Sequence, residues 1–180
     1  VELSLWAEHP ASGERYPGLL GAYAVGAVTV APGRPASYAG CRVGRLAVWG
    51  GGRSGTVSGR GFRWVSDSVP VTDHAELLAH LQDRMRQAEG VLALDAAKEG
   101  WNVVLDGPLN RIRSLHALVA GYVKTHRRAL LAPEEHRLVP TLAVGQRTVL
   151  YALGADRYTC YARIGTAGPG ASAWGGIARL

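Results

Sequence analysis

The chain has 180 residues, of which 47% are apolar and 19% charged, and its net charge is +6. This composition is too apolar for an intrinsically disordered chain, and no unbroken apolar run reaches the roughly 18 residues of a membrane-spanning helix. The length suits one domain of roughly 100–200 residues, so we expect residues 1–180 to form a single domain without a membrane partner.

The first part of the chain has the pattern of a β-sheet. Residues 1–7 alternate between apolar and polar side chains, as in a strand, and residues 19–31 form an apolar run that predicts a buried strand. Further strands are expected at residues 41–49 and 61–65, with the glycine-rich residues 50–55 as a hairpin loop. Together these segments predict a β-meander.

A helix is predicted after Val71, where apolar residues begin to recur every three or four positions. Thr72 or Asp73 can cap its first turn, because both side chains accept hydrogen bonds from free backbone N–H groups. The helix is expected to end near Gly90 or to continue through it to Lys98.

The remaining segments mix both types of structure. Residues 101–105 are a short apolar run that predicts a buried strand, and residues 148–153 and 158–164 predict a hairpin. Residues 114–125 read as a helix, or as a helix that leads into a strand at 119–123. Strands alternating with helices predict an α/β fold with a mixed β-sheet flanked by helices.

The basic excess consists of eighteen arginines and two lysines. Guanidinium groups bind phosphate through two parallel hydrogen bonds, which favours a polyanion as partner, although a GC-rich genome would produce the same bias. The two cysteines, Cys41 and Cys160, lack the spacing of a metal site and predict a reduced cytoplasmic protein. Cys160 lies in an apolar and aromatic pattern, so we expect it in the core.

Asp106 is the strongest candidate for a functional residue, because it ends the predicted strand 101–105. The carboxyl ends of strands in α/β sheets face the crevice where ligands bind, and carboxylates suit Mg²⁺ or Mn²⁺. The sequence Asp106-Gly107-Pro108 is equally typical of a plain turn, in which the aspartate bonds its own backbone. Both interpretations stay open.

Metal-assisted cleavage of a phosphodiester needs more than one carboxylate, and the predicted helix offers Glu76 and Glu89. Glu76 lies three residues after Asp73, which is the spacing of a capping box. Glu89 falls on the apolar stripe of Leu81 and Met85, at the expected end of the helix, where the dipole disfavours a carboxylate and no local partner is evident. We favour a functional Glu89 over a frayed, solvated one.

Lys124 is one of only two lysines in an arginine-rich chain. Its position at the end of a candidate strand favours a phosphate contact or a cation that stabilises a transition state. The alternative is a solvated basic stretch over residues 121–128. His126 is a further possible acid or base, but a single histidine seldom has that role.

Several segments resemble the NurA family of DNA nucleases. The most specific is Leu105-Asp106-Gly107-Pro108-Leu109. The other segments follow in the order of the family and cover most of the chain: residues 84–89, 119–125, 161–163 and 173–180.

The resemblance implies a ribonuclease-H-like fold with the element order β-β-β-α-β-α-β. It also implies a Mn²⁺- or Mg²⁺-dependent DNA nuclease that works in end resection beside a HerA-type hexameric ATPase, usually as a homodimer. By this resemblance Glu89 and Asp106 are metal ligands, and Lys124 is the family's lysine.

The family's first aspartate, in a "VDGS"-like motif on the first strand, has no match in this sequence. We therefore expect a piece of a longer chain, with that aspartate before Val1 and a later acidic or histidine position after Leu180. The alternative is a member that has lost its metal site and serves as an inert nucleic-acid-binding or assembly module.

Overall fold

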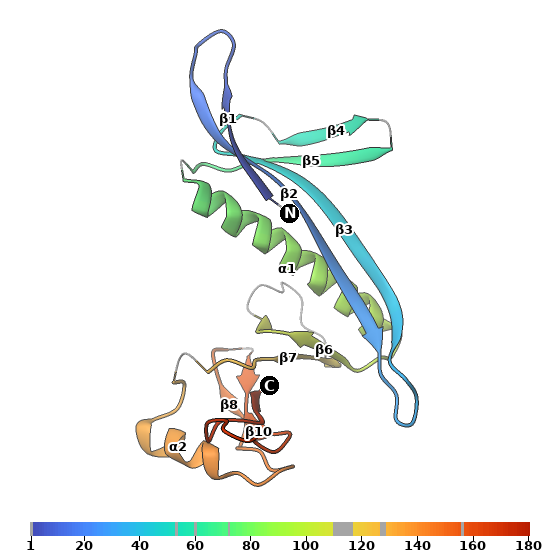
Figure 1. Cartoon of the computed structure of the whole chain (residues 1–180), viewed down its shortest axis with the longest axis vertical. Helices are drawn as coiled ribbons and strands as arrows, with labels where there is room; N and C mark the ends of the chain where they lie inside the picture. The colour runs from blue at the N-terminus through green and yellow to red at the C-terminus, as the bar shows by residue number, and fades with distance from the viewer. Residues whose placement is uncertain are drawn as a thin grey trace. The chain divides into compact units, whose positions relative to one another are not determined.

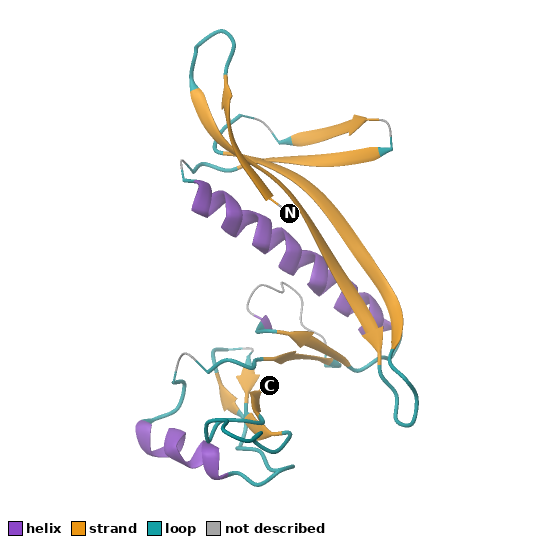
Figure 2. Ribbon diagram, viewed as in Figure 1, coloured by secondary structure: helices purple, strands orange, loops and turns teal. Residues whose placement is uncertain are grey.

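The computed structural model describes residues 2–52, 54–59, 61–71, 73–109, 117–126, 129–155 and 157–180. These residues group into two compact units, the first extending to Asp95 and the second beginning at Ala96. Figure 1 labels most of the helices and strands, and Figure 2 colours them by type. Each unit is described in turn.

The first unit contains a mixed five-stranded sheet with the strand order β1-β2-β3-β5-β4. Strands β1, β2 and β3 pair antiparallel, β3 and β5 pair parallel, and β5 and β4 pair antiparallel. In Figure 1 the long strands β2 and β3 run side by side. The strands are β1 (Glu2–Glu8), β2 (Arg15–Thr29), β3 (Ser37–Trp49), β4 (Gly55–Gly59) and β5 (Phe62–Ser68).

The predicted strands of this unit are confirmed as β1, β2, β3 and β5. The predicted meander is wrong, because β3 and β5 pair parallel, with Val65 opposite Leu46, whereas the neighbouring strands of a meander are antiparallel. Residues 50–55 therefore lead to β4 instead of closing a hairpin between neighbouring strands. Strand β4 was not predicted, since its sequence, GTVSG, has only one large apolar residue.

Helix α1 (His74–Lys98) packs on this sheet. The helix and the sheet share one buried cluster of apolar side chains in contact. It consists of Leu77 and Leu81 of the helix and Leu19, Leu46 and Val48 of the sheet. Burial of each such side chain stabilises the fold by roughly 1.5–3 kcal/mol.

The helix approaches the sheet closely because β2 has a glycine beneath it. A Cβ atom placed on Gly21 would lie 2.4 Å from Cδ2 of Leu81, well inside van der Waals contact. The absent side chain of Gly21 therefore makes the space that Leu81 occupies.

Both ends of α1 follow from local chemistry. Asp73 is the N-cap, as predicted, since its Oδ1 accepts a hydrogen bond of 2.9 Å from the Ala75 N–H; Thr72 lies outside the described residues. The helix continues through Gly90 to Lys98, which confirms the longer of the two expected lengths. It stops before Gly100, whose φ of 92° is unfavourable for other residues.

The second unit consists of short elements. Strands β6 and β7 pair parallel, β8 and β9 antiparallel, and β10 and β11 antiparallel. Its buried core contains Val139, Tyr161 and Ile177. The elements are β6 (Val103–Asp106), β7 (Val119–Tyr122), α2 (Pro133–Leu138), η2 (Val139–Thr141), β8 (Tyr151–Ala152), β9 (Tyr158–Thr159), β10 (Tyr161–Arg163) and β11 (Ile177–Arg179).

Most predictions for this unit are confirmed. The hairpin exists as β8 and β9, and the strand alternative for residues 119–123 is confirmed as β7. Residues 114–116 of the expected helix lie outside the described residues. The strand at 101–105 exists as β6, but its expected burial is wrong because Val104 is 66% exposed. Cys160 is buried, as expected, and burial raises the pKa of its thiol.

The α/β character and the mixed sheet are as predicted from the sequence. The element order differs from that of the resemblance, because five strands rather than three precede α1. In the part of the chain that the structure describes, no helix is both long and apolar enough to cross a bilayer.

The contact between Gly21 and Leu81 can be tested by enlarging the first residue and shortening the second. We expect Gly21→Ala to lower the free energy of unfolding by about 1–3 kcal/mol through overpacking, and Leu81→Ala to lower it by about 2–5 kcal/mol through a cavity. The double variant should lose less than the sum, because the new methyl group enters the space that Leu81 leaves.

Urea denaturation measures these differences. Gly26→Ala is the matched control, since a Cβ there lies 3.8 Å from its nearest neighbour and should change the stability by less than about 0.5 kcal/mol. Strict additivity of the two changes would contradict the described packing.

Candidate functional site

Asp106 and Lys124 lie together where two neighbouring strands end. Strands β6 and β7 are parallel and in register, so that Asp106 lies opposite Tyr122 and Lys124 follows two residues later. The Lys124 Nζ is 3.1 Å from Oδ1 and 3.1 Å from Oδ2 of Asp106. The structure therefore brings together two of the three residues that the sequence indicated.

This ion pair is open to solvent. The side chains of Lys124 and Asp106 are 58% and 77% exposed, and exposed pairs contribute only about 0–1 kcal/mol to stability. The Lys124 ammonium also lies 5.7 Å from the centre of the Tyr122 ring. The pair thus does little for the fold, and both charges are accessible to a ligand.

The residue after Asp106 extends the pairing of the two strands. The Gly107 N–H donates a hydrogen bond of 2.8 Å to the Tyr122 carbonyl, which extends the pairing by one residue. A Cβ on Gly121 would lie 2.7 Å from the Gly107 carbonyl oxygen. Gly107 and Gly121 therefore form a close approach of the two strand ends.

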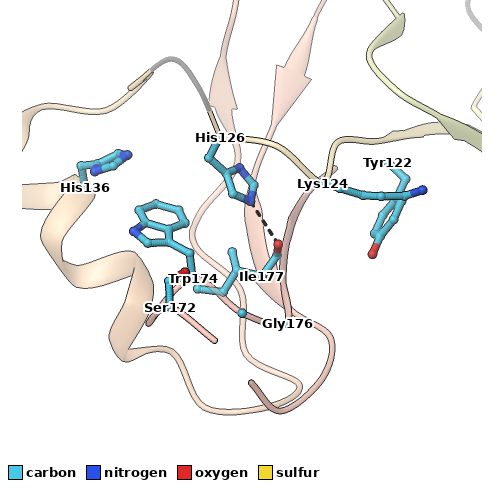
Figure 3. Close-up of a pocket in the computed structure, with 9 residues that line it drawn as sticks. Tyr122, Lys124, His126, His136, Ser172, Trp174, Gly176 and Ile177 are labelled. Carbon is cyan, nitrogen blue, oxygen red and sulfur yellow. Dashed lines mark hydrogen bonds between the residues drawn. The ribbon is translucent and has the colours of Figure 1, made fainter. Parts of the chain in front are cut away.

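A pocket of about 640 Å³ lies beside Lys124 in the second unit. Aromatic and basic side chains dominate its wall, and Figure 3 shows Lys124 and Tyr122 on one side and Trp174 and His136 on the other. None of the described residues in its lining is acidic. Its lining comprises Tyr122, Lys124, His126, His136, Ser172, Trp174 and residues 175–177.

His126 is held in one orientation by the backbone. Its Nε2 lies 3.0 Å from the Ile177 carbonyl oxygen, the contact dashed in Figure 3. Because a carbonyl only accepts hydrogen bonds, Nε2 carries the proton, and the neutral ring has its lone pair on Nδ1. That Nδ1 is buried and has no hydrogen-bond partner within the described ranges.

Trp174 lies close to both histidines of the pocket. Its ring centre is 5.0 Å from that of His126 and 4.6 Å from that of His136. Tyr161 forms a T-shaped pair with the same indole, with ring centres 5.7 Å apart. The tryptophan is therefore the centre of an aromatic cluster.

Polar atoms without partners gather in this cluster. Besides His126 Nδ1, the His136 Nε2 and the hydroxyl groups of Tyr151 and Tyr161 are buried with no hydrogen bond to a described residue. Burial, with a smaller effect of the nearby Tyr161, raises the pKa of Tyr151, so this hydroxyl stays protonated. An unpaired buried polar group costs about 1–3 kcal/mol, so these atoms lower the stability of the cluster.

Arg163 positions the wall of the pocket. It is only 8% exposed, and its guanidinium donates four hydrogen bonds to backbone carbonyl groups on two segments. Two of these acceptors flank Trp174. The acceptors are the oxygens of Leu142 at 2.6 Å, Gly175 at 2.7 Å, Pro140 at 2.7 Å and Ala173 at 3.0 Å.

In the sequence analysis, Arg163 and Trp174 appear only as members of segments that resemble the NurA family, without a role of their own. No local pattern identifies their roles, because the acceptors of Arg163 are backbone atoms 10 to 23 positions away. His136, in the last turn of α2, also contributes its ring to the pocket wall.

Glu89 lies on α1 in the first unit. Its expected place at the helix end is wrong, because the helix extends nine residues beyond it to Lys98. The expected lack of a local partner is also wrong, since Glu89 Oε2 lies 2.7 Å from Nη1 of Arg86, one helical turn earlier. A metal site shared by Glu89 and Asp106 stays a prediction.

The described residues do not fit a two-metal site. They contain no group of three or more His, Cys, Asp or Glu side chains that could hold a metal ion, whereas two metals need several carboxylates. Asp106 offers hard oxygen atoms, but both of them face Lys124. A cation at Asp106 would compete with this ammonium group.

No family model and no curated protein matched the sequence when it was compared with them. The likeness to NurA nucleases therefore rests on the segments quoted above, chiefly the one that contains Asp106.

Arg163→Lys should loosen the wall of the pocket, although it keeps the charge. Lysine cannot reproduce the planar, forked arrangement of the guanidinium donors. A hydrogen bond to a charged group is worth about 1.5–3 kcal/mol, so we expect the free energy of unfolding of the second unit to fall by about 2–4 kcal/mol. Hydrogen exchange at the Gly175 and Ile177 amides measures this loss, because both amides bond within the segment that Arg163 holds. The exposed Arg147→Lys is the control, and equal protection in both variants would contradict the assigned role.

Proposed function

We propose that the chain acts on DNA as part of a NurA-like nuclease with a ribonuclease-H-like fold. The observation that carries the proposal is the pairing of Asp106 with Lys124 at the ends of two parallel strands. This is the place where open α/β sheets bind their ligands.

The charges of this site suit a phosphate backbone. The Lys124 ammonium is exposed and stands beside a pocket without acidic lining among the described residues. A phosphate oxygen that approaches Lys124 would compete with the Asp106 carboxylate for the same exposed ammonium group. The net charge of +6 and the eighteen arginines add a long-range attraction for DNA.

The NurA resemblance supports the remaining parts of the proposal. It makes Mn²⁺ or Mg²⁺ the cofactor, Glu89 and Asp106 its ligands, and Lys124 a catalytic residue. Because the described donors fall short of a metal site, we assign no step of cleavage to the ion. On the same resemblance we propose a homodimer that works with a HerA-type ATPase in the cytoplasm.

A second candidate is an inert nucleic-acid-binding module. It is favoured by one observation: Lys124 lies against both oxygens of the carboxylate that a metal ion would need. Both candidates bind DNA through Lys124, but only the first cleaves it.

DNA binding is tested with the two lysines of the chain. We expect Lys124→Met to weaken binding to a DNA oligonucleotide and to lower the slope of log affinity against log salt by about 1, because one phosphate contact is lost. Lys98→Met removes the same charge from an exposed position and should leave that slope unchanged. Equal effects of the two variants would remove Lys124 from the DNA contact.

Cleavage is tested with Mn²⁺ and the Asp106→Asn variant. If Asp106 holds a metal ion, the cleavage rate should fall by at least about 100-fold, since even residues that support a metal ligand are worth about 10–100-fold. Glu89→Gln should show a similar loss, and Glu99→Gln, an exposed change near the end of α1, should show none. Equal cleavage by wild type and Asp106→Asn would refute the metal-ligand role, and DNA binding without cleavage would favour the inert module.

A further inference from the structure

We infer that the pocket beside Lys124 binds one unpaired nucleotide of a DNA strand. The base would lie against the side of the pocket formed by Trp174 (the Trp174 wall), and the phosphate of the nucleotide would lie at Lys124. The inference rests on the proposed function and adds the form of DNA that the site selects. It follows from the size of the pocket and from the separate positions of its cationic and aromatic side chains.

The size of the pocket suits a single nucleotide. A volume of about 640 Å³ lies within the roughly 300–1,000 Å³ of small-molecule sites. A base pair that remains stacked in a duplex cannot enter such a space. A base reaches a pocket only when it is unstacked, as at a frayed end or in a single strand.

The cationic and the aromatic side chains of the pocket lie on different sides, as the phosphate and the base of a nucleotide require. Lys124 provides a cation on one side, and Trp174 and His136 provide ring surfaces on the other (Figure 3). Stacking of a base on an aromatic side chain is largely independent of its sequence. The Lys124 side and the Trp174 side therefore suit a phosphate and a base, respectively.

The Trp174 wall is built before any ligand arrives. Arg163 binds the carbonyl groups on both sides of Trp174, and Tyr161 packs on its ring. A wall that is already ordered loses less entropy when it binds. Trp174 is therefore suited to holding a base.

The test compares single-stranded and duplex DNA of equal length at one salt concentration. We expect wild-type protein to bind the single-stranded oligonucleotide about 10-fold more tightly than the blunt duplex. Trp174→Leu should lower the single-strand affinity about 10-fold, which is within the measured worth of one stacked base, and leave the duplex affinity unchanged. Trp101→Leu is the control, because Trp101 is a 51% exposed tryptophan of the same unit outside the pocket lining.

Trp174→Phe guards against a folding defect, because it keeps an aromatic core residue and should give a smaller loss of the same kind. Near-ultraviolet circular dichroism checks that each variant is folded. Competition adds a second readout: deoxyadenosine 5′-monophosphate should displace the single strand at concentrations where inorganic phosphate does not.

The outcomes separate the inference from the proposed function. If Trp174→Leu weakens both forms of DNA equally, or if phosphate competes as well as the mononucleotide, the nucleotide pocket is refuted while DNA binding through Lys124 stands. If neither form of DNA binds, the proposed function fails together with the inference.

Discussion

The buried guanidinium of Arg163 is the interaction on which the candidate site depends. A charge taken out of water is costly unless it is fully hydrogen-bonded, and here four backbone carbonyl groups compensate for it. The segment around Trp174 is rich in glycine, alanine and serine and has little regular structure before β11. Its position therefore comes from Arg163 rather than from a strand or helix of its own.

The first unit is stabilised by a different interaction, the close packing of apolar side chains. Leu81 of α1 fills the space above Gly21, and the same helix ends at a glycine of positive φ that turns the chain toward β6. Strand β6 then ends at Asp106. In the first unit a residue without a side chain, Gly21, makes the packing possible, and in the second unit Gly121 does the same beside Gly107.

Much of the fold could be predicted because its signals are local. Alternation in residues 1–7, the Asp73 cap and the apolar run before Asp106 each depend on neighbouring residues. The wrong meander has a long-range cause, because β5 lies between β3 and β4 and pairs parallel with β3. The wrong prediction for Glu89, that it ends the helix without a local partner, has a local cause. The helix continues through Gly90, and Arg86 lies one turn away.

The sequence by itself determined the α/β character, the principal strands and helix, and the presence of Asp106 and Lys124 at strand ends. Only the tertiary structure decided that Lys124 lies 3.1 Å from both oxygens of Asp106 and that His126 presents Nδ1 as its acceptor. Periodicity and capping act over a few residues and can be seen in the sequence. These contacts of Lys124 and His126 join positions 18 and 51 residues apart, and they are set by strand register and by backbone carbonyl groups, which every residue type carries alike.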